Sequence, residues 1–138
     1  MKRVLQLYYS INRMERTFFD SPIEIIKELP KDVESITIIS CSELFEIVSF
    51  PPGLISLSIR DCPIRLLPPV PASLRVLCIE DCQLRQLPSL HHTALRIFCC
   101  KNTPLYAIPA LPSTVEILNA EDVTFNLLTH QFEKKLAV

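Results

Sequence analysis

The side chains whose type could support chemistry in this chain are six cysteines: Cys41, Cys62, Cys78, Cys82, Cys99 and Cys100. Thiolates bind zinc, attack electrophiles or pair as disulfides. Zinc usually takes four ligands, often in closely spaced pairs, and the sequence contains neither CxxC nor HExxH. A reactive thiol needs a base and an electropositive setting, and no histidine is expected beside these cysteines. We therefore expect no metal site and no catalytic residue among them.

The histidines and carboxylates form no catalytic group either. His91 and His92 occupy a segment where other parts of the chain have proline, which favours an irregular turn. The chain has a single glycine, which excludes phosphate-cradling loops such as GxGxxG. A row of mostly acidic residues is expected at the strand ends, formed by Asp61, Asp81, Asn102 and Asp122. Aspartate and asparagine are common in turns, which explains the row, and a bound cation or a basic segment of a partner is the alternative. We therefore expect that the protein binds no cofactor and is not an enzyme.

Charge and hydropathy narrow the classes of partner. The 138 residues carry a formal net charge of -1, so no basic excess exists to neutralise a nucleic-acid backbone or to attract anionic lipid. Hydrophobic residues make up 49% of the chain, which indicates a folded domain. No apolar stretch reaches the roughly 18 residues of a membrane-spanning helix. We therefore expect binding to neither nucleic acid nor membrane.

The elements that position the cysteines repeat every 20 or 21 residues. From residue 54 the chain reads LISLSIRDCPIRLLP, and from residue 74 it reads LRVLCIEDCQLRQLP. Repeats begin at residues 33, 54, 74, 95 and 115, and they follow the template LxxLxLxxN/CxL. The LxL pair predicts a short strand, and stacked repeats bury a continuous core. Cys41, Cys62 and Cys82 share one core position, so we expect free thiols and a reducing, cytoplasmic setting.

The fold class that follows is an α/β leucine-rich-repeat solenoid. Short parallel strands form its concave face, and proline-rich returns such as 67–71 and 108–112 form extended or 3-10 convex segments. Residues 33–128 hold the five repeats, and residues 129–138 form a C-terminal cap with a helix from 130 to 136. Residues 1–32 form an N-terminal cap, with an edge strand at 3–7 and a helix that starts near Asp20-Ser21-Pro22 and buries Ile23, Ile26 and Leu29. A helical hairpin over 1–29 is the alternative.

Side chains between the buried strand positions point outward, and equivalent residues of neighbouring strands form rows. The first row is Ser35, Ser56, Val76, Ile97 and Ile117. The second row is Thr37, Ser58, Cys78, Cys99 and Asn119. The third row is Ile39, Arg60, Glu80, Lys101 and Glu121. Val4, Gln6 and Tyr8 of the expected edge strand would extend these rows.

The apolar members of the first row predict a protein-binding patch, because contiguous apolar surface marks interaction sites. Strand propensity alone is the alternative explanation for branched residues there. The alternating charges of the third row predict either a self-satisfied ladder or a rim that sets a partner's register. Cys78 and Cys99 are expected to be neighbours, and a disulfide in an oxidising medium is the alternative to free thiols. The predicted binding residues are Ser56, Ser58, Arg60, Val76, Cys78, Glu80, Ile97, Cys99, Lys101, Ile117, Asn119 and Glu121.

The returns resemble those of a known group of repeat proteins. The pairs that carry the resemblance are Leu67-Pro68, Val70-Pro71, Leu87-Pro88, Ile108-Pro109 and Leu111-Pro112. They are similar to the LPxLPxxLxxLxVxxNxL phrase of LPX-type leucine-rich-repeat effectors that Gram-negative pathogens secrete through type III or type IV systems. The chain has cysteine where that group usually has asparagine, and no Cys-x-Asp of the kind that serves its ubiquitin-ligase domains.

The resemblance implies a virulence-associated, secreted module that recognises another protein. We expect a non-enzymatic bacterial effector or effector regulator, translocated into the host cytoplasm, that occludes or scaffolds a host protein or another bacterial effector. It would act as a monomer or weak dimer. The alternatives are the substrate-recognition part of a larger ubiquitin-ligase-type effector and a self-associating structural module.

Overall fold

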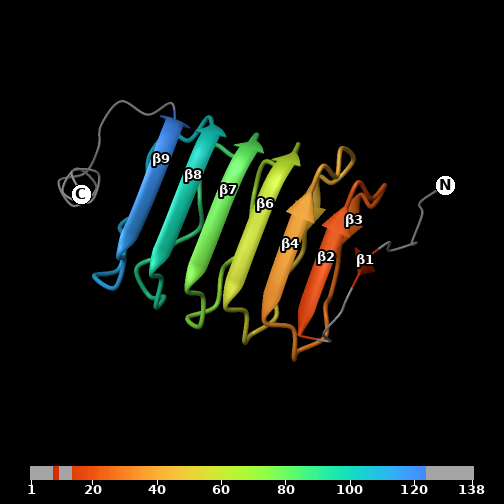
Figure 1. Cartoon of the computed structure of the whole chain (residues 1–138), viewed down its shortest axis with the longest axis horizontal. Helices are drawn as coiled ribbons and strands as arrows, with labels where there is room; N and C mark the ends of the chain where they lie inside the picture. The colour runs from red at the N-terminus through yellow and green to blue at the C-terminus, as the bar shows by residue number, and fades with distance from the viewer. Residues whose placement is uncertain (1–7, 10–13, 124–138) are drawn as a thin grey trace.

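The protein is a solenoid built on one long sheet. The computed structural model describes residues 8–9 and 14–123. Within this part of the chain seven strands form a sheet in the order β1-β2-β4-β6-β7-β8-β9, and the six from β2 onward are parallel (Figure 1). Their bounds are Tyr8–Tyr9 (β1), Glu15–Phe19 (β2), Ser35–Ile39 (β4), Ser56–Cys62 (β6), Val76–Cys82 (β7), Ile97–Thr103 (β8) and Ile117–Val123 (β9). Five turns therefore connect the six parallel strands.

The returns form a second layer behind the sheet. The first two returns pair as short parallel strands, β3 (Ile25–Ile26) and β5 (Glu46–Ile47). Most returns end in a tight turn that begins at proline, in which the carbonyl of Pro51, for example, accepts a hydrogen bond from the Leu54 N–H. The return that lacks this proline closes from Leu90 to Thr93, and the Thr93 hydroxyl also donates to the Leu90 carbonyl at 2.7 Å. Each turn aims the chain into the next strand.

The core lies between the two layers and follows two different periods. Along the strands every second side chain is buried, as in the pattern of Leu57 and Ile59 in β6. Along the returns every third side chain faces the core, as shown by Ile64, Leu67 and Val70. A three-residue period is that of an extended, polyproline-like segment, which needs no internal hydrogen bonds. The strands and the returns therefore bury their apolar faces against each other.

Five of the strands begin two residues after the starts of the predicted repeats, at residues 35, 56, 76, 97 and 117. The capping helix predicted near residues 20–29 is wrong, as is the helical hairpin for the residues of 1–29 that are described. Residues 14–123 contain no α-helix and no 3-10 helix, so the described chain is all-β rather than α/β. Ile23, Ile26 and Leu29 form one more return, because spacing by three fits an extended return as well as a helix.

The N-terminal segment adds a strand that the repeat pattern does not reveal. β2 pairs in parallel with β4, with Phe18 opposite Ile38, and the short β1 pairs antiparallel on its other side. The strand beside β4 is therefore β2, and Tyr8 does not extend the rows directly from β4 as expected. Val4, Gln6 and the rest of the strand expected at 3–7 lie outside the described residues, as does the C-terminal cap.

One residue in the left-handed backbone region lies near the end of each of β6, β7 and β8, just before the last buried side chain, and one directly follows each of β2 and β4. These residues, at φ between 46° and 54°, are Asp20, Ser40, Asp61, Asp81 and Asn102. Asparagine and aspartate tolerate this region better than branched residues do. The acidic row at the strand ends is thus explained in large part by backbone conformation. This left-handed backbone conformation bends the chain from the strand into the return.

Valine at position 61 is expected to destabilise the fold by about 1–3 kcal/mol, because a β-branched residue is strained at the Asp61 φ of 54°. Asp61→Gly should cost much less, since glycine adopts this conformation freely. Ser58→Val, in the extended part of the same strand, is the matched control and should be nearly neutral. Urea unfolding of the three variants measures the difference. Equal stability of Asp61→Val and Ser58→Val would contradict the strain.

Candidate functional site

The three predicted rows exist as hydrogen-bonded neighbours on one face of the sheet, which we call the open face. Val76 lies between Ser56 and Ile97, and the register continues to Ile117. Cys78 is the Cα partner of Cys99, and Glu80 that of Lys101. The backbone positions of all twelve predicted binding residues are therefore brought together on β6 to β9.

The open face is apolar along its first row over the last three strands. Val76 and Ile97 are partly exposed, and Ile117 is 53% exposed. Cys78 and Cys99 lie next to them, both partly buried. The first-row residues at the other end, Ser35 and Ser56, are small and polar. The apolar surface is thus confined to the C-terminal half of this row.

The missed strand β2 adds a second apolar area at the opposite corner of the open face. Phe19 follows Ile39 in the third row and is 57% exposed. Glu15 and Thr17 extend the other two rows. The signal for this strand was weak: Phe18 stands 20 residues before Ile38, but Arg16 stands where Ile36 would predict an apolar residue.

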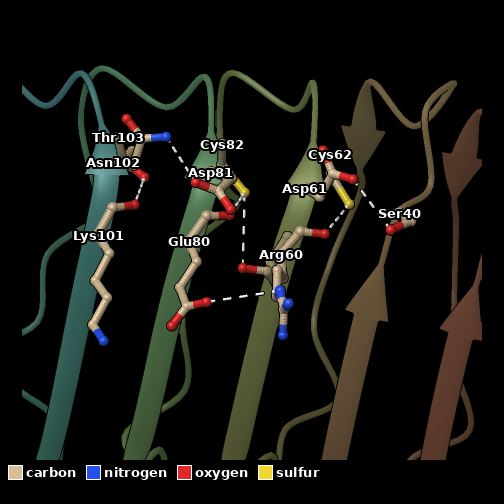
Figure 2. A network of polar contacts seen from close by, with 11 residues as sticks. Ser40, Arg60, Asp61, Cys62, Glu80, Asp81, Cys82, Lys101, Asn102 and Thr103 are labelled. Carbon is tan, nitrogen blue, oxygen red and sulfur yellow. Dashed lines mark hydrogen bonds and ion pairs between the residues drawn. The ribbon is translucent and has the colours of Figure 1, made fainter. Parts of the chain in front are cut away.

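The third row carries charges that are only loosely paired within the chain (Figure 2). The Arg60 Nε lies 3.8 Å from the Glu80 Oε2, with both side chains partly exposed. Lys101 forms no ion pair with a residue of the described part of the chain, and Figure 2 shows its side chain apart from Glu80. An exposed pair at this distance contributes little to folding, so these charges remain free to meet a partner.

The strand-end residues satisfy one another by hydrogen bonds (Figure 2). The Asn102 amide donates to Asp81 Oδ1 at 2.7 Å, and the Ser40 hydroxyl donates to Asp61 Oδ2 at 3.2 Å. The Cys82 thiol donates to the Glu80 carbonyl at 3.1 Å. Thr103 occupies the same slot in the next strand, and its hydroxyl donates to the Lys101 carbonyl at 2.9 Å. The cysteine position thus ties the strand end to its own backbone.

All six cysteines are free thiols. A hydrogen bond with Cys62 lowers the pKa of Cys41 to about 7, whereas the pKa values of four other thiols are raised. Burial raises the pKa of Cys82 to about 11 and that of Cys100 to about 12. Burial and a hydrogen bond with Cys99 raise the pKa of Cys78 to about 12. The contact with Cys41, together with burial, raises the pKa of Cys62. A protonated thiol is a poor nucleophile and a poor metal ligand.

Within residues 8–9 and 14–123, no group of three or more His, Cys, Asp and Glu side chains could hold a metal ion. No helix in that part of the chain is long and apolar enough to cross a membrane. His91 and His92 are exposed, and His92 Nε2 lies 2.9 Å from the Val70 carbonyl oxygen.

Two shallow hollows, absent from the sequence analysis, lie at the edge of the sheet where the strands begin. One of about 390 Å³ includes Met14, Ile55 and Ala94, and one of about 690 Å³ includes Arg96 and Glu116. Arg96 and Glu116 form an exposed ion pair at 2.8 Å. Only the residues before each strand line these hollows, so no repeat motif marks them. Both hollows are open to solvent, unlike the enclosed and mainly apolar pockets that hold most small ligands.

The chain was compared with known proteins at the level of sequence. No protein-family model matches it, and no curated protein matches it significantly.

Proposed function

We propose that the protein is a non-enzymatic protein-binding module that acts through the open face. The observation that carries the proposal is the apolar first row of Val76, Ile97 and Ile117 on three neighbouring strands. A contiguous apolar surface flanked by polar side chains is typical of a protein interaction site. By covering a functional surface of its partner, or by holding two partners together, such a module occludes or scaffolds them.

The kind of module that we propose is an LPX-type leucine-rich-repeat effector or effector regulator. Its support is the solenoid of 20-residue and 21-residue turns together with the Leu-Pro pairs in the returns. The partner would then be a host protein or another bacterial effector. Six free thiols favour action in a reducing compartment such as the host cytoplasm.

The shape of the open face favours a flat or extended partner surface. Side chains of the rows stand about 4.8 Å apart across the strands, so a partner meets them as a regular grid. The partly exposed thiols of Cys78 and Cys99 provide soft apolar contacts at its centre. The charges of Arg60, Glu80 and Lys101 form the rim along which a partner is oriented.

Replacing Val76 and Ile97 by glutamate is expected to weaken partner binding by about thirtyfold or more, the effect of losing a central contact of about 2 kcal/mol. The substitutions place charges in the apolar first row without touching the core. Val48→Glu/Leu66→Glu is the matched control, because both side chains are at least half exposed but lie on the returns. The measurement is capture of proteins from host and bacterial lysates, followed by titration of the purified partner.

Circular dichroism of both double variants establishes that they fold. If a protein is captured by the wild type and by the return variant but not by Val76→Glu/Ile97→Glu, the open face is the binding surface. Capture that survives the open-face substitutions would overturn the proposal and direct attention to the returns.

A further inference from the structure

Two neighbouring strands of the open face, β7 and β8, have an unusual residue pattern. β7 begins Val-Leu-Cys-Ile and β8 begins Ile-Phe-Cys-Cys, so both outward and inward positions are apolar. The neighbouring β6 begins Ser-Leu-Ser-Ile, with polar residues outward. Parallel strands that read as continuous apolar runs are typically covered on both faces. The returns cover one face of β7 and β8, so the pattern indicates an occupant on the other.

The charges of the third row constrain what that occupant is. From β6 to β9 the row reads Arg60, Glu80, Lys101 and Glu121, in the order plus, minus, plus, minus. Read in the opposite direction, the same row is minus, plus, minus, plus. Two antiparallel copies of this row therefore place opposite charges against each other at every position. A row with this property is complementary to itself.

We propose that the occupant is a second copy of this chain, which docks face to face on the open face. The two copies are related by a two-fold axis that runs parallel to the strands and passes between β7 and β8. This inference rests on the proposed function, because the second copy docks on that same protein-binding surface. The dimer is isologous, so every contact across it occurs twice.

A two-fold axis along the strands sets each row of one copy against the same row of the second copy. Because it preserves the strand direction, each row faces its own counterpart, with the order of strands reversed. Val76 of one copy then lies opposite Ile97 of the second copy, and Glu80 lies opposite Lys101 of the second copy. The other in-plane two-fold axis, across the strands, would set the first row against the third and bring Val76 over Glu80. The charge and apolar patterns together select the axis along the strands.

The area that the dimer covers indicates a low affinity. The axis between β7 and β8 sets β6 to β9 of the two copies against each other. Four seven-residue strands, spaced by about 4.8 Å and rising about 3.3 Å per residue, present a face of roughly 440 Å². Stable interfaces cover about 800 Å² per partner. The dimer is therefore expected to dissociate on dilution, and its size depends on protein concentration.

Sedimentation velocity of the purified chain over a concentration series tests this arrangement. The wild type is expected to pass from monomer to dimer. Lys101→Glu and Glu80→Lys each set two like-charge contacts across the axis and should weaken the dimer about tenfold or more. The double variant Glu80→Lys/Lys101→Glu restores opposite charges and should restore the dimer. Lys27→Glu, an exposed charge change on a return, is the control that should leave the dimer intact.

Restored association of the double variant is expected only if the partner is a second copy of the chain, because both copies then carry both charge reversals. A different protein would keep its own charges and would meet like charge at both positions. A wild type that stays monomeric throughout the series would overturn the dimer. The effect of Val76→Glu/Ile97→Glu on lysate capture would then decide the proposed function separately. A dimer that forms but is unchanged by the single charge reversals, or is not restored by the double variant, would overturn this axis. Loss of the dimer in both single variants with recovery in the double variant supports it.

Discussion

Phe18→Ala is expected to lower the free energy of unfolding by about 3–5 kcal/mol, one of the largest effects that a single substitution should have in this chain. Phe18 is fully buried, and it is one of the two largest enclosed side chains of the described core. Its removal leaves a cavity between β2 and the first return, which backbone pairing on both sides of β2 prevents from collapsing. Urea unfolding followed by circular dichroism measures the loss.

The adjacent residue supplies the control for this experiment. Phe19 is 57% exposed on the open face, so Phe19→Ala removes the same side chain without opening a cavity and should cost less than about 1 kcal/mol. A large difference between the neighbours shows that the first turn is part of the continuous core. Similar, small losses for both variants would contradict the packing of β2 against the returns.

The stability of the protein is expected to fall steeply above pH 9. Burial raises the pKa of Cys82 to about 11 and that of Cys100 to about 12, whereas in the unfolded chain both thiols ionise near 9.0. Their contribution is complete below pH 9 and is lost as the pH rises toward these values, because only the unfolded chain then releases its protons. The slope is roughly 1.4 kcal/mol per pH unit for each thiol.

The substitutions that test this pH dependence of stability use residues found at the equivalent positions of neighbouring turns. Thr103 occupies the position of Cys82 one turn later and makes the same hydrogen bond to its backbone, and Ala120 occupies the position of Cys100. Cys82→Thr/Cys100→Ala should therefore fold at pH 7 and lose stability more slowly above pH 9. Comparison with the wild type cancels the lysine and tyrosine titrations of the same pH range. Parallel curves for the two proteins would show that these thiols are not the cause.

The sequence predicted the repeated strands because their apolar positions recur at 20 or 21 residues, and stacking permits only that register. It did not reveal β2, because Arg16 replaces the apolar residue of later repeats and Ser21, just after the strand, replaces their cysteine. Within β2 only Phe18 keeps the pattern. The spacing of Ile23, Ile26 and Leu29 is compatible with a helix and with an extended return. Tertiary packing, which short-range periodicity does not contain, decides between them.

The rows of the open face were predictable for the same reason as the strands, because alternation fixes which side chains point outward. The residues of each row follow from the repeat spacing of 20 or 21 residues. The structure adds the exposed Phe19 and the distance between the side chains of Arg60 and Glu80. The hollows beside Arg75 and Arg96 were not predictable, since they depend on how far neighbouring turns stand apart. The left-handed residues were visible only as an acidic row whose cause, the backbone bend, needs coordinates.

The parallel pairing of each strand with the strand one turn away has a consequence for how the chain folds. Every such pairing joins residues only 20 or 21 positions apart, so none of these pairings requires the closure of a long loop. The entropic barrier to folding is then set by the length of one turn and not by the length of the chain. Structure can begin at any adjacent pair of turns and spread outward in both directions. A longer relative built from the same turns would gain stability with each one while the search for its first contacts stayed equally short.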